Sequence, residues 1–255
     1  MKLATWNVNS LKVRLPQVLD FLAAHKPDVL CLQETKTEDE KFPILDIHAA
    51  GYQAVYSGQK TYNGVAILAR EPPQDVTMGI ADFDDPQKRV IAAVIQGVRV
   101  ICVYIPNGES VTSDKYGYKL DWLERLNKCI KVELEKYPRL AILGDYNIAP
   151  ENRDVHDPKF WEGKVLFSDP EKSAFNALVA LGLCDSFRLF EQPEKSYTWW
   201  DYRLNGFKRN LGLRIDHILL SAELAKSCKS CSIDRAPRAH ERPSDHAPVM
   251  VELEI

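Results

Sequence analysis

The sequence predicts an α/β protein in which two β-sheets pack face to face with helices on the outside. Many short apolar runs with the length of buried strands are spread over the whole chain, interrupted by a few long segments with helical periodicity. No linker rich in Pro, Ser or Gly separates them, which favours a single domain over residues 1–255. A doubly wound nucleotide-binding fold is the alternative. It requires a glycine-rich loop after the first strand, and the segment WNVNSLKVR (6–14) has no glycine.

Each expected element has its own signal in the chain. A β-prone run covers 3–6, apolar residues at helical spacing cover 13–25, and Pro27 then breaks the helix. Further buried strands are expected at 29–32, 64–68, 90–95, 98–105, 140–143, 215–220 and 249–253. Helical patterns also fit 116–137, 172–181 and 222–226.

The composition is that of an ordinary globular chain. Its 255 residues are 45% hydrophobic and 27% charged, which excludes disordered, collagen-like and coiled-coil classes. The formal net charge of −3 argues against a surface covered in Lys and Arg for nonspecific nucleic-acid binding, but it leaves room for a local basic face.

The cysteines and the N-terminus bear on the compartment. Cys31 and Cys102 lie in apolar runs, and Cys228 and Cys231 have a metal-like spacing but no second pair to complete a zinc site. The N-terminus lacks the apolar core of a signal peptide, and no run approaches the roughly 20 apolar residues that span a bilayer. We therefore expect a reduced, cytoplasmic protein with no membrane partner.

Polar side chains stand at the ends of several predicted strands. They are Asn7, Glu34, Asp145, Asn147, Asp216 and Asp245, with His217 and His246 next to the last two aspartates. Sheets present side chains to a crevice at strand ends, and converging carboxylate and amide oxygens suit a hard cation such as Mg²⁺. A single loop Asp or Asn usually caps a turn, but six at strand ends favour a metal site. Such a site supports phosphoryl transfer.

Two other hydrolytic chemistries have weaker support. A serine nucleophile on a sharp elbow would need a GxSxG motif, and the sequence has none. A glycosidase with paired carboxylates is compatible with the composition, but no spacing singles out two partners.

Eight motifs in one order carry a family resemblance. They are WNVNSLKVR (6–14), LQETK (32–36), YNGVAIL (62–68), YIPNGES (104–110), GDYNIAP (144–150), TWWDYR (198–203), LGLRIDHILLS (211–221) and RPSDHAP (242–248). With this order and spacing the chain resembles the exonuclease III family of apurinic/apyrimidinic (AP) endonucleases, within the endonuclease/exonuclease/phosphatase superfamily.

The resemblance implies a four-layered α/β sandwich and a Mg²⁺-dependent hydrolase that leaves a 3′-hydroxyl on DNA. Mn²⁺ could substitute for Mg²⁺. The activities known in the family are 3′→5′ exonuclease, 3′-phosphatase, 3′-repair diesterase and cleavage 5′ to an abasic site. The implied partner is double-stranded DNA with 3′ ends, 3′-blocking groups or abasic sites, and the implied state is a monomer.

The same resemblance implies a metal site. Glu34 would be the principal ligand, with Asn7 beside it, and Asp245 would be a further candidate carboxylate. Asn9 stands where some family members have Asp, so we assign no second metal through it.

It also implies a set of catalytic residues. Asp145 would activate the attacking water and Asn147 would orient the phosphate or the water. His246 would contact the phosphate with support from Asp216, and Tyr104 would contact the phosphate or the leaving oxygen. A histidine paired with a carboxylate stays protonated at neutral pH and can donate to an anionic phosphate.

A basic and aromatic segment at 195–214 is the candidate DNA-binding surface. It has five basic residues and one acidic residue, a local charge of +4, and it contains Trp199, Trp200 and Arg203. Basic residues interleaved with aromatic ones suit phosphate contacts plus stacking. We expect one of the two tryptophans to face the substrate and the other to be packed. Further candidate contacts are Tyr62, Asn107, Arg89, Lys115 and Lys119.

Leu166 and Leu213 bear on the choice between activities. In the family a small residue usually borders the pocket for the extrahelical abasic sugar, and the alignment places Leu166 there. Leu213 stands where some AP endonucleases have Trp. A bulky Leu166 would crowd a flipped-out sugar while leaving a 3′ end accessible, which predicts weakened AP endonuclease activity beside 3′-phosphatase and exonuclease activity.

Three alternatives remain. The chain could be a full-strength AP endonuclease, or a phosphodiesterase or phosphatase of the same superfamily that acts on a non-DNA substrate. The last typically carries His where YIPNG lies here and lacks GLRID. An inactive, binding-only relative would have lost catalytic residues, whereas Glu34, Asp145 and His246 are all present.

Overall fold

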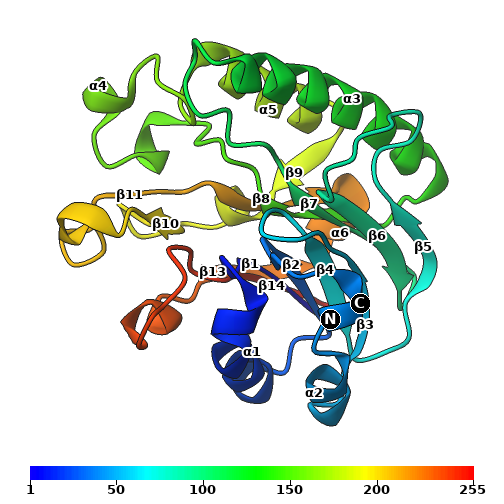
Figure 1. Cartoon of the computed structure of the whole chain (residues 1–255). Helices are drawn as coiled ribbons and strands as arrows, with labels where there is room; N and C mark the ends of the chain where they lie inside the picture. Colours follow the sequence, from blue (N-terminus) through cyan, green and yellow to red (C-terminus); the bar gives the residue numbers. More distant parts are fainter.

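A computed structural model describes residues 1–255 and contains two six-stranded sheets that pack face to face (Figure 1). The first sheet has the order β13 (Cys228–Ile233), β14 (Val249–Leu253), β1 (Lys2–Asn7), β2 (Val29–Gln33), β4 (Val65–Ala69) and β3 (Gln53–Ser57). The second has the order β5 (Gln74–Met78), β6 (Val90–Ile95), β7 (Val98–Tyr104), β8 (Leu140–Asp145), β12 (Asp216–Ser221) and β9 (Leu183–Asp185).

The helices and a short ribbon complete the fold. The helices are α1 (Leu11–His25), α2 (Ile44–Ala49), α3 (Asp114–Lys136), α4 (Pro158–Trp161), α5 (Asp169–Val179) and α6 (Ala222–Lys226). The ribbon pairs β10 (Trp199–Trp200) with β11 (Gly212–Leu213) and projects from one end of the sandwich (Figure 1).

Three apolar clusters define four layers. The largest lies between the sheets and joins residues such as Cys31 and Ile67 of the first sheet to Ile91 and Leu143 of the second. A second cluster fills the space between the second sheet and helices α3 and α5, and a third lies under α1 and α2 on the first sheet (Figure 1). The apolar area removed from water at these three interfaces is the main term that stabilises the stack.

The predicted fold class is confirmed. Both sheets are mixed, because β1 runs parallel to β2, β7 runs parallel to β8, and the other pairs are antiparallel. In the two large sheets the sequence did not reveal β3, β5, β9 and β13. These strands bury few residues: none in β5 and one in each of the other three. Helices α1, α3 and α5 begin two or three residues before the expected positions, α3 and α5 with Asp114 and Asp169 in their first turns.

None of the helices combines the length and the apolar character needed to cross a bilayer. All six cysteines are free thiols; Cys228 and Cys231 both lie on β13.

A buried charge network fixes the loop that follows β8. Arg214 is almost fully buried and donates to Asp154 (2.7 Å) and Asp185 (2.8 Å). It also lies 3.0 Å from Nδ1 of His217, whose Nε2 lies 2.8 Å from the Ile148 carbonyl oxygen. The network assigns the neutral tautomer with the proton on Nε2, because Nδ1 accepts from Arg214. Burial and the Arg214 guanidinium lower the pKa of His217 to about 3.

Because the pKa of His217 is low in the folded protein, the free energy of unfolding should fall as the pH is lowered. Below about pH 6.5 the unfolded chain protonates His217 and the folded chain does not, so this group lowers the free energy of unfolding by up to ~1.4 kcal/mol per pH unit. Urea unfolding at pH 7.5, 6 and 5 should therefore show a shallower pH slope for His217→Gln than for the wild type.

The exposed His48 provides the matched control, and His48→Gln should keep the wild-type slope. An unchanged slope in His217→Gln would show that this histidine does not carry the linkage.

Candidate active site

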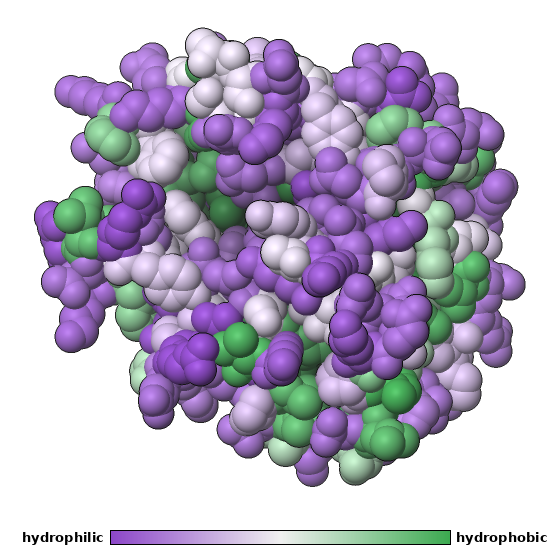
Figure 2. Space-filling view, viewed as in Figure 1, coloured by the Kyte–Doolittle hydropathy of each residue, from purple (hydrophilic) through white to green (hydrophobic).

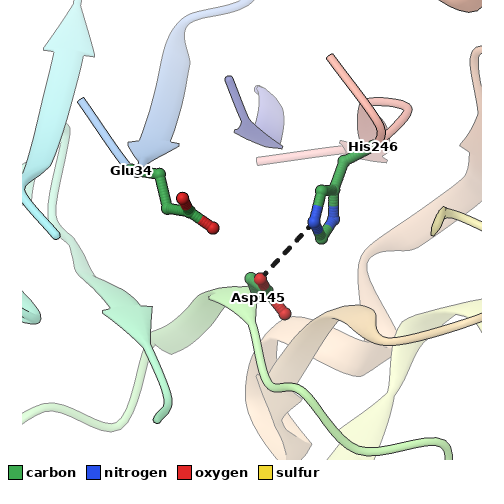
Figure 3. A group of neighbouring side chains, drawn as sticks. All are labelled: Glu34, Asp145 and His246. Carbon is green, nitrogen blue, oxygen red and sulfur yellow. Dashed lines mark ion pairs between the residues drawn. The ribbon is translucent and has the colours of Figure 1, made fainter. Parts of the chain in front are cut away.

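The polar strand ends meet at one edge of the sandwich. Asn7 ends β1, Glu34 follows β2, and Asp145 ends β8. Asp216 begins β12 directly opposite Asp145 in the strand register, and His246 lies in the loop before β14. Figure 3 shows Glu34, Asp145 and His246 facing one another from three separate segments. The predicted convergence of these side chains is present.

The Glu34 carboxylate bonds to three other side chains. Its Oε1 accepts from the Asn7 amide (2.8 Å) and from the Tyr104 hydroxyl (2.9 Å), and its Oε2 pairs with Lys36 (2.8 Å). Burial works against ionisation of Glu34, but Lys36 and Asn7 outweigh it and lower its pKa. Glu34 is therefore a carboxylate at neutral pH and keeps 18% of its side chain exposed to a ligand.

The surroundings of Asp145 act on its pKa in opposite directions. Its Oδ2 accepts from Asn7 (2.9 Å) and its Oδ1 accepts from the Asn147 backbone N–H (2.9 Å). Burial raises the pKa of Asp145 to about 7; Asp216 adds to the rise, while His246 and Asn7 oppose it. A carboxylate with a pKa near neutrality is suited to accept a proton.

His246 lies between two carboxylates. Its Nδ1 is 2.9 Å from Asp216, and its Nε2 is 3.7 Å from Asp145 (Figure 3). Burial alone would lower the pKa of His246, but Asp216 and Asp145 raise it to about 10. The ring is therefore an imidazolium at neutral pH, with Nε2–H on the Asp145 side.

Asn147 is held from several directions. Its Nδ2 donates to the Ile105 carbonyl (3.0 Å), and its Oδ1 accepts from Asn107 (3.1 Å). Its backbone has φ +51°, and Glu34 has φ +53°. A left-handed backbone at a residue other than glycine costs about 1–2 kcal/mol, so the surrounding bonds must hold both residues in place.

The cluster of Glu34, Asp145 and His246 could hold a metal ion, because one ligand atom from each lies within 4.8 Å of the others. The two carboxylates match the oxygen ligands that hard divalent cations prefer. The imidazolium of His246 has no free lone pair for a metal, so we assign the cation to the carboxylate side of the cluster.

Two residues predicted as ligands already have partners. The NH₂ group of Asn7 bridges Glu34 and Asp145, and its Oδ1 accepts from the Asn9 backbone (3.0 Å). Asp245 accepts from Asn9 (3.0 Å) and from the Trp199 indole (3.0 Å). Their roles as ligands stay predictions; Asn7 would have to turn its amide to offer oxygen.

The paired tryptophans have different environments, as expected. Trp199 is half-buried, donates to Asp245 and forms a backbone bridge with His246. Trp200 is fully buried and its indole donates to Asn210. The prediction that Trp200 contacts substrate is therefore wrong, because Trp200 is a buried packing residue. The predicted contact residue Arg203 is accessible, with 84% of its side chain exposed.

Other predicted contacts surround a groove of about 790 Å³ that reaches Tyr104. Tyr62 and Asn107 are exposed there. Arg89 is nearly buried; it stacks over the Tyr104 ring and donates to the Tyr104 carbonyl (3.1 Å). Arg89, predicted as a DNA contact, therefore holds Tyr104 in place.

Leu166 and Leu213 fill one small apolar cluster, with Trp199 packed against it. Both leucines are buried, and Leu166 has φ +77°. That these leucines border a pocket for an abasic sugar stays a prediction.

The prediction that Lys119 contacts DNA is wrong, because the Lys119 side chain is fully buried. It donates to the carbonyls of Asn107 (3.1 Å) and Asn147 (2.7 Å) and pairs with Glu171 (2.5 Å). Glu171 in turn accepts from the Leu166 backbone (3.0 Å). Sequence reasoning missed this connection between three loops, and also the pairing of Lys36 with Glu34, which the spacing in LQETK could have indicated.

Comparisons with known proteins agree with this geometry. The sequence profile of the endonuclease/exonuclease/phosphatase family matches residues 4–246. Exodeoxyribonuclease III of Haemophilus influenzae is 37% identical, over 99% of this chain and 100% of its own length. The structure of the 3′-phosphatase NExo from Neisseria, bound to a product DNA hairpin, is 50% identical with a TM-score of 0.98 and full coverage of both chains. An AP endonuclease from Archaeoglobus fulgidus is 41% identical with a TM-score of 0.96, also over both full chains.

The ion pair between His246 and Asp216 predicts a measurable titration. Asp216→Asn removes the first of the carboxylates that raise the pKa of His246, so this pKa should fall clearly below about 10. NMR titration of the ring, assigned by the signal that His246→Gln removes, measures it. A ring pKa unchanged in Asp216→Asn would mean that this pair does not set the charge of His246.

Proposed function

The chain belongs to the endonuclease/exonuclease/phosphatase family, and on that premise we propose that it is a Mg²⁺-dependent DNA repair nuclease acting at 3′ ends. It is a hydrolase of the exodeoxyribonuclease III type. The observation that carries the proposal is the convergence of Glu34, Asp145 and the His246–Asp216 pair at one strand edge. The likeness to a 3′-phosphatase over the full length of both chains supports the choice of 3′ ends.

Glu34 would hold the cation, with Asn7 and Asp245 as further candidate ligands, and Asp145 lies beside them to act on the water. A bound Mg²⁺, or Mn²⁺ in its place, would neutralise charge on the phosphate oxygens. Tyr104 donates to Glu34, and the Asn147 backbone donates to Asp145, so both residues lie next to the site and would position the phosphate or the water.

The proposed step uses the two residues with shifted pKa values. Asp145 accepts a proton from the water as the water oxygen bonds to phosphorus. The P–O3′ bond breaks, and the departing 3′ oxygen takes up a proton from solvent to become the 3′-hydroxyl. The imidazolium of His246 donates to a phosphate oxygen, where negative charge accumulates. Asp216 keeps His246 protonated during this step.

Removal of the base or of the metal carboxylate tests this mechanism. Asp145→Asn and Glu34→Ala should each lower phosphate release from a 3′-phosphate duplex by about 10²–10⁴-fold, because each removes a group that acts in the transition state. Glu124→Gln, an exposed carboxylate on α3, is the control and should be unchanged. Full Mg²⁺-dependent activity in either site variant would refute the mechanism.

The bulk of Leu166 is an argument that the chain acts on 3′ ends in preference to abasic sites. Leu166 fills the cluster beside Trp199 in a strained left-handed backbone conformation that glycine adopts freely. Leu166→Gly should therefore raise the rate on an abasic duplex relative to the rate on a 3′-phosphate duplex, measured in parallel. Leu166→Met, which keeps the bulk, should not. An unchanged ratio in Leu166→Gly would mean that Leu166 does not limit abasic-site cleavage.

The remaining features of the proposal have simpler support. One domain over residues 1–255 is supported by pairing of the terminal strands β1 and β14 in one sheet. A reducing, cytoplasmic location is supported by six free cysteines. A monomer acting on double-stranded DNA follows the family resemblance. A non-DNA phosphatase is the remaining alternative, and hydrolysis of inositol phosphates in preference to 3′-phosphate DNA would favour it.

A further inference from the structure

A cavity of about 660 Å³ lies beside the site, between α4 and the β10–β11 ribbon. Apolar and aromatic side chains dominate its wall: Phe160, Trp161, Trp199, Leu204 and Leu211. Figure 2 shows a hollow with apolar surface at this end of the molecule. Neither the metal cluster nor the predicted pocket for the abasic sugar accounts for this space.

The cavity shares a wall with the catalytic residues. Trp199 lines it, while the same indole donates to Asp245 (3.0 Å) and the Trp199 backbone bridges to His246. Trp199 also packs against the small apolar cluster that Leu166 and Leu213 fill. Trp199 therefore borders both a filled apolar cluster and an open cavity, and only the cavity has room for a further group.

The chemistry of the wall fits a nucleobase with a phosphate near it. Aromatic side chains bind the faces of bases by stacking, without sequence preference. Arg209 lies in the same wall, bonds only the Leu204 carbonyl (3.5 Å) and has no carboxylate partner, so its charge is available to a phosphate. Arg203, in contrast, is paired with Asp201 (2.6 Å). The Trp161 indole N–H is buried without a hydrogen-bond partner.

We propose that this cavity binds the base of the 3′-terminal nucleotide while that nucleotide is being removed. The inference rests on the proposed function and deepens it. In the exonuclease reaction, water bonds to phosphorus, the P–O3′ bond breaks, and the departing 5′-nucleotide carries a base. In the 3′-phosphatase reaction the departing group is inorganic phosphate, which has no base. The cavity is thus a subsite for exonuclease digestion that the phosphatase reaction does not use.

The difference between these two reactions provides the test. In the variant Phe160→Ala/Leu204→Ala both truncated side chains are largely exposed, at 55% and 77%, so the core is left intact. kcat/KM for release of the terminal nucleotide from a blunt 3′-hydroxyl duplex should fall at least about fivefold, the loss expected for one stacked base. Phosphate release from a 3′-phosphate duplex should keep the wild-type rate.

Two matched controls isolate the base. Removal of a 3′-terminal tetrahydrofuran residue, which has the sugar and phosphate but no base, should be insensitive to the double variant. Leu45→Ala removes an equally exposed leucine (79%) on α2 and should leave all rates unchanged.

Other results would overturn either the base subsite or the proposed function. If the double variant loses nucleotide release and phosphate release in equal proportion, or loses neither, the base subsite is wrong. The same holds if it loses release of the tetrahydrofuran residue as strongly as release of a normal nucleotide. If the wild-type chain releases neither phosphate nor nucleotide from DNA, the proposed function itself fails.

Discussion

Two buried carboxylates face each other across neighbouring strands, and the site depends on the histidine between them. The register of β8 and β12 places Asp145 opposite Asp216, and His246 reaches both. Without a positive charge, two buried carboxylates would suppress each other's ionisation. The imidazolium opposes the rise that burial causes in the pKa of Asp145, so Asp145 is closer to ionisation than burial alone would leave it. The same triad therefore combines a carboxylate suited to accept a proton with an imidazolium that can donate a hydrogen bond.

The loops around this triad are held from both sides by buried ion pairs. Lys119 and Glu171 connect the loops that carry Asn107, Asn147 and Leu166. Arg214 connects Asp154 and Asp185 on the opposite side. Breaking one partner of such a pair leaves an uncompensated buried charge and destabilises by about 3–5 kcal/mol. The hydrogen bond from Lys119 to the Asn147 carbonyl helps hold the left-handed backbone of Asn147.

Much of the fold and of the central site could be predicted from the sequence, because buried strands and the polar residues at their ends both leave local signals. The VLCL run before Glu34 and the AILG run before Asp145 show this directly. Residues whose role depends on packing could not be assigned. Lys119 looks like a surface lysine until α3 turns it inward, and only the fold separates buried Trp200 from Trp199. Strand β5, which is exposed throughout, has no apolar run to mark it.

We propose that this edge of the sandwich hydrolyses phosphate esters at DNA 3′ ends. The most direct measurement compares wild-type rates on three duplexes, with a 3′-phosphate, an internal abasic site and blunt 3′-hydroxyl ends, each with Mg²⁺ and with EDTA. We expect fast phosphate release and nucleotide release, slower abasic-site cleavage, and loss of all three activities in EDTA. Abasic-site cleavage faster than both reactions at 3′ ends, or full activity in EDTA, would contradict it.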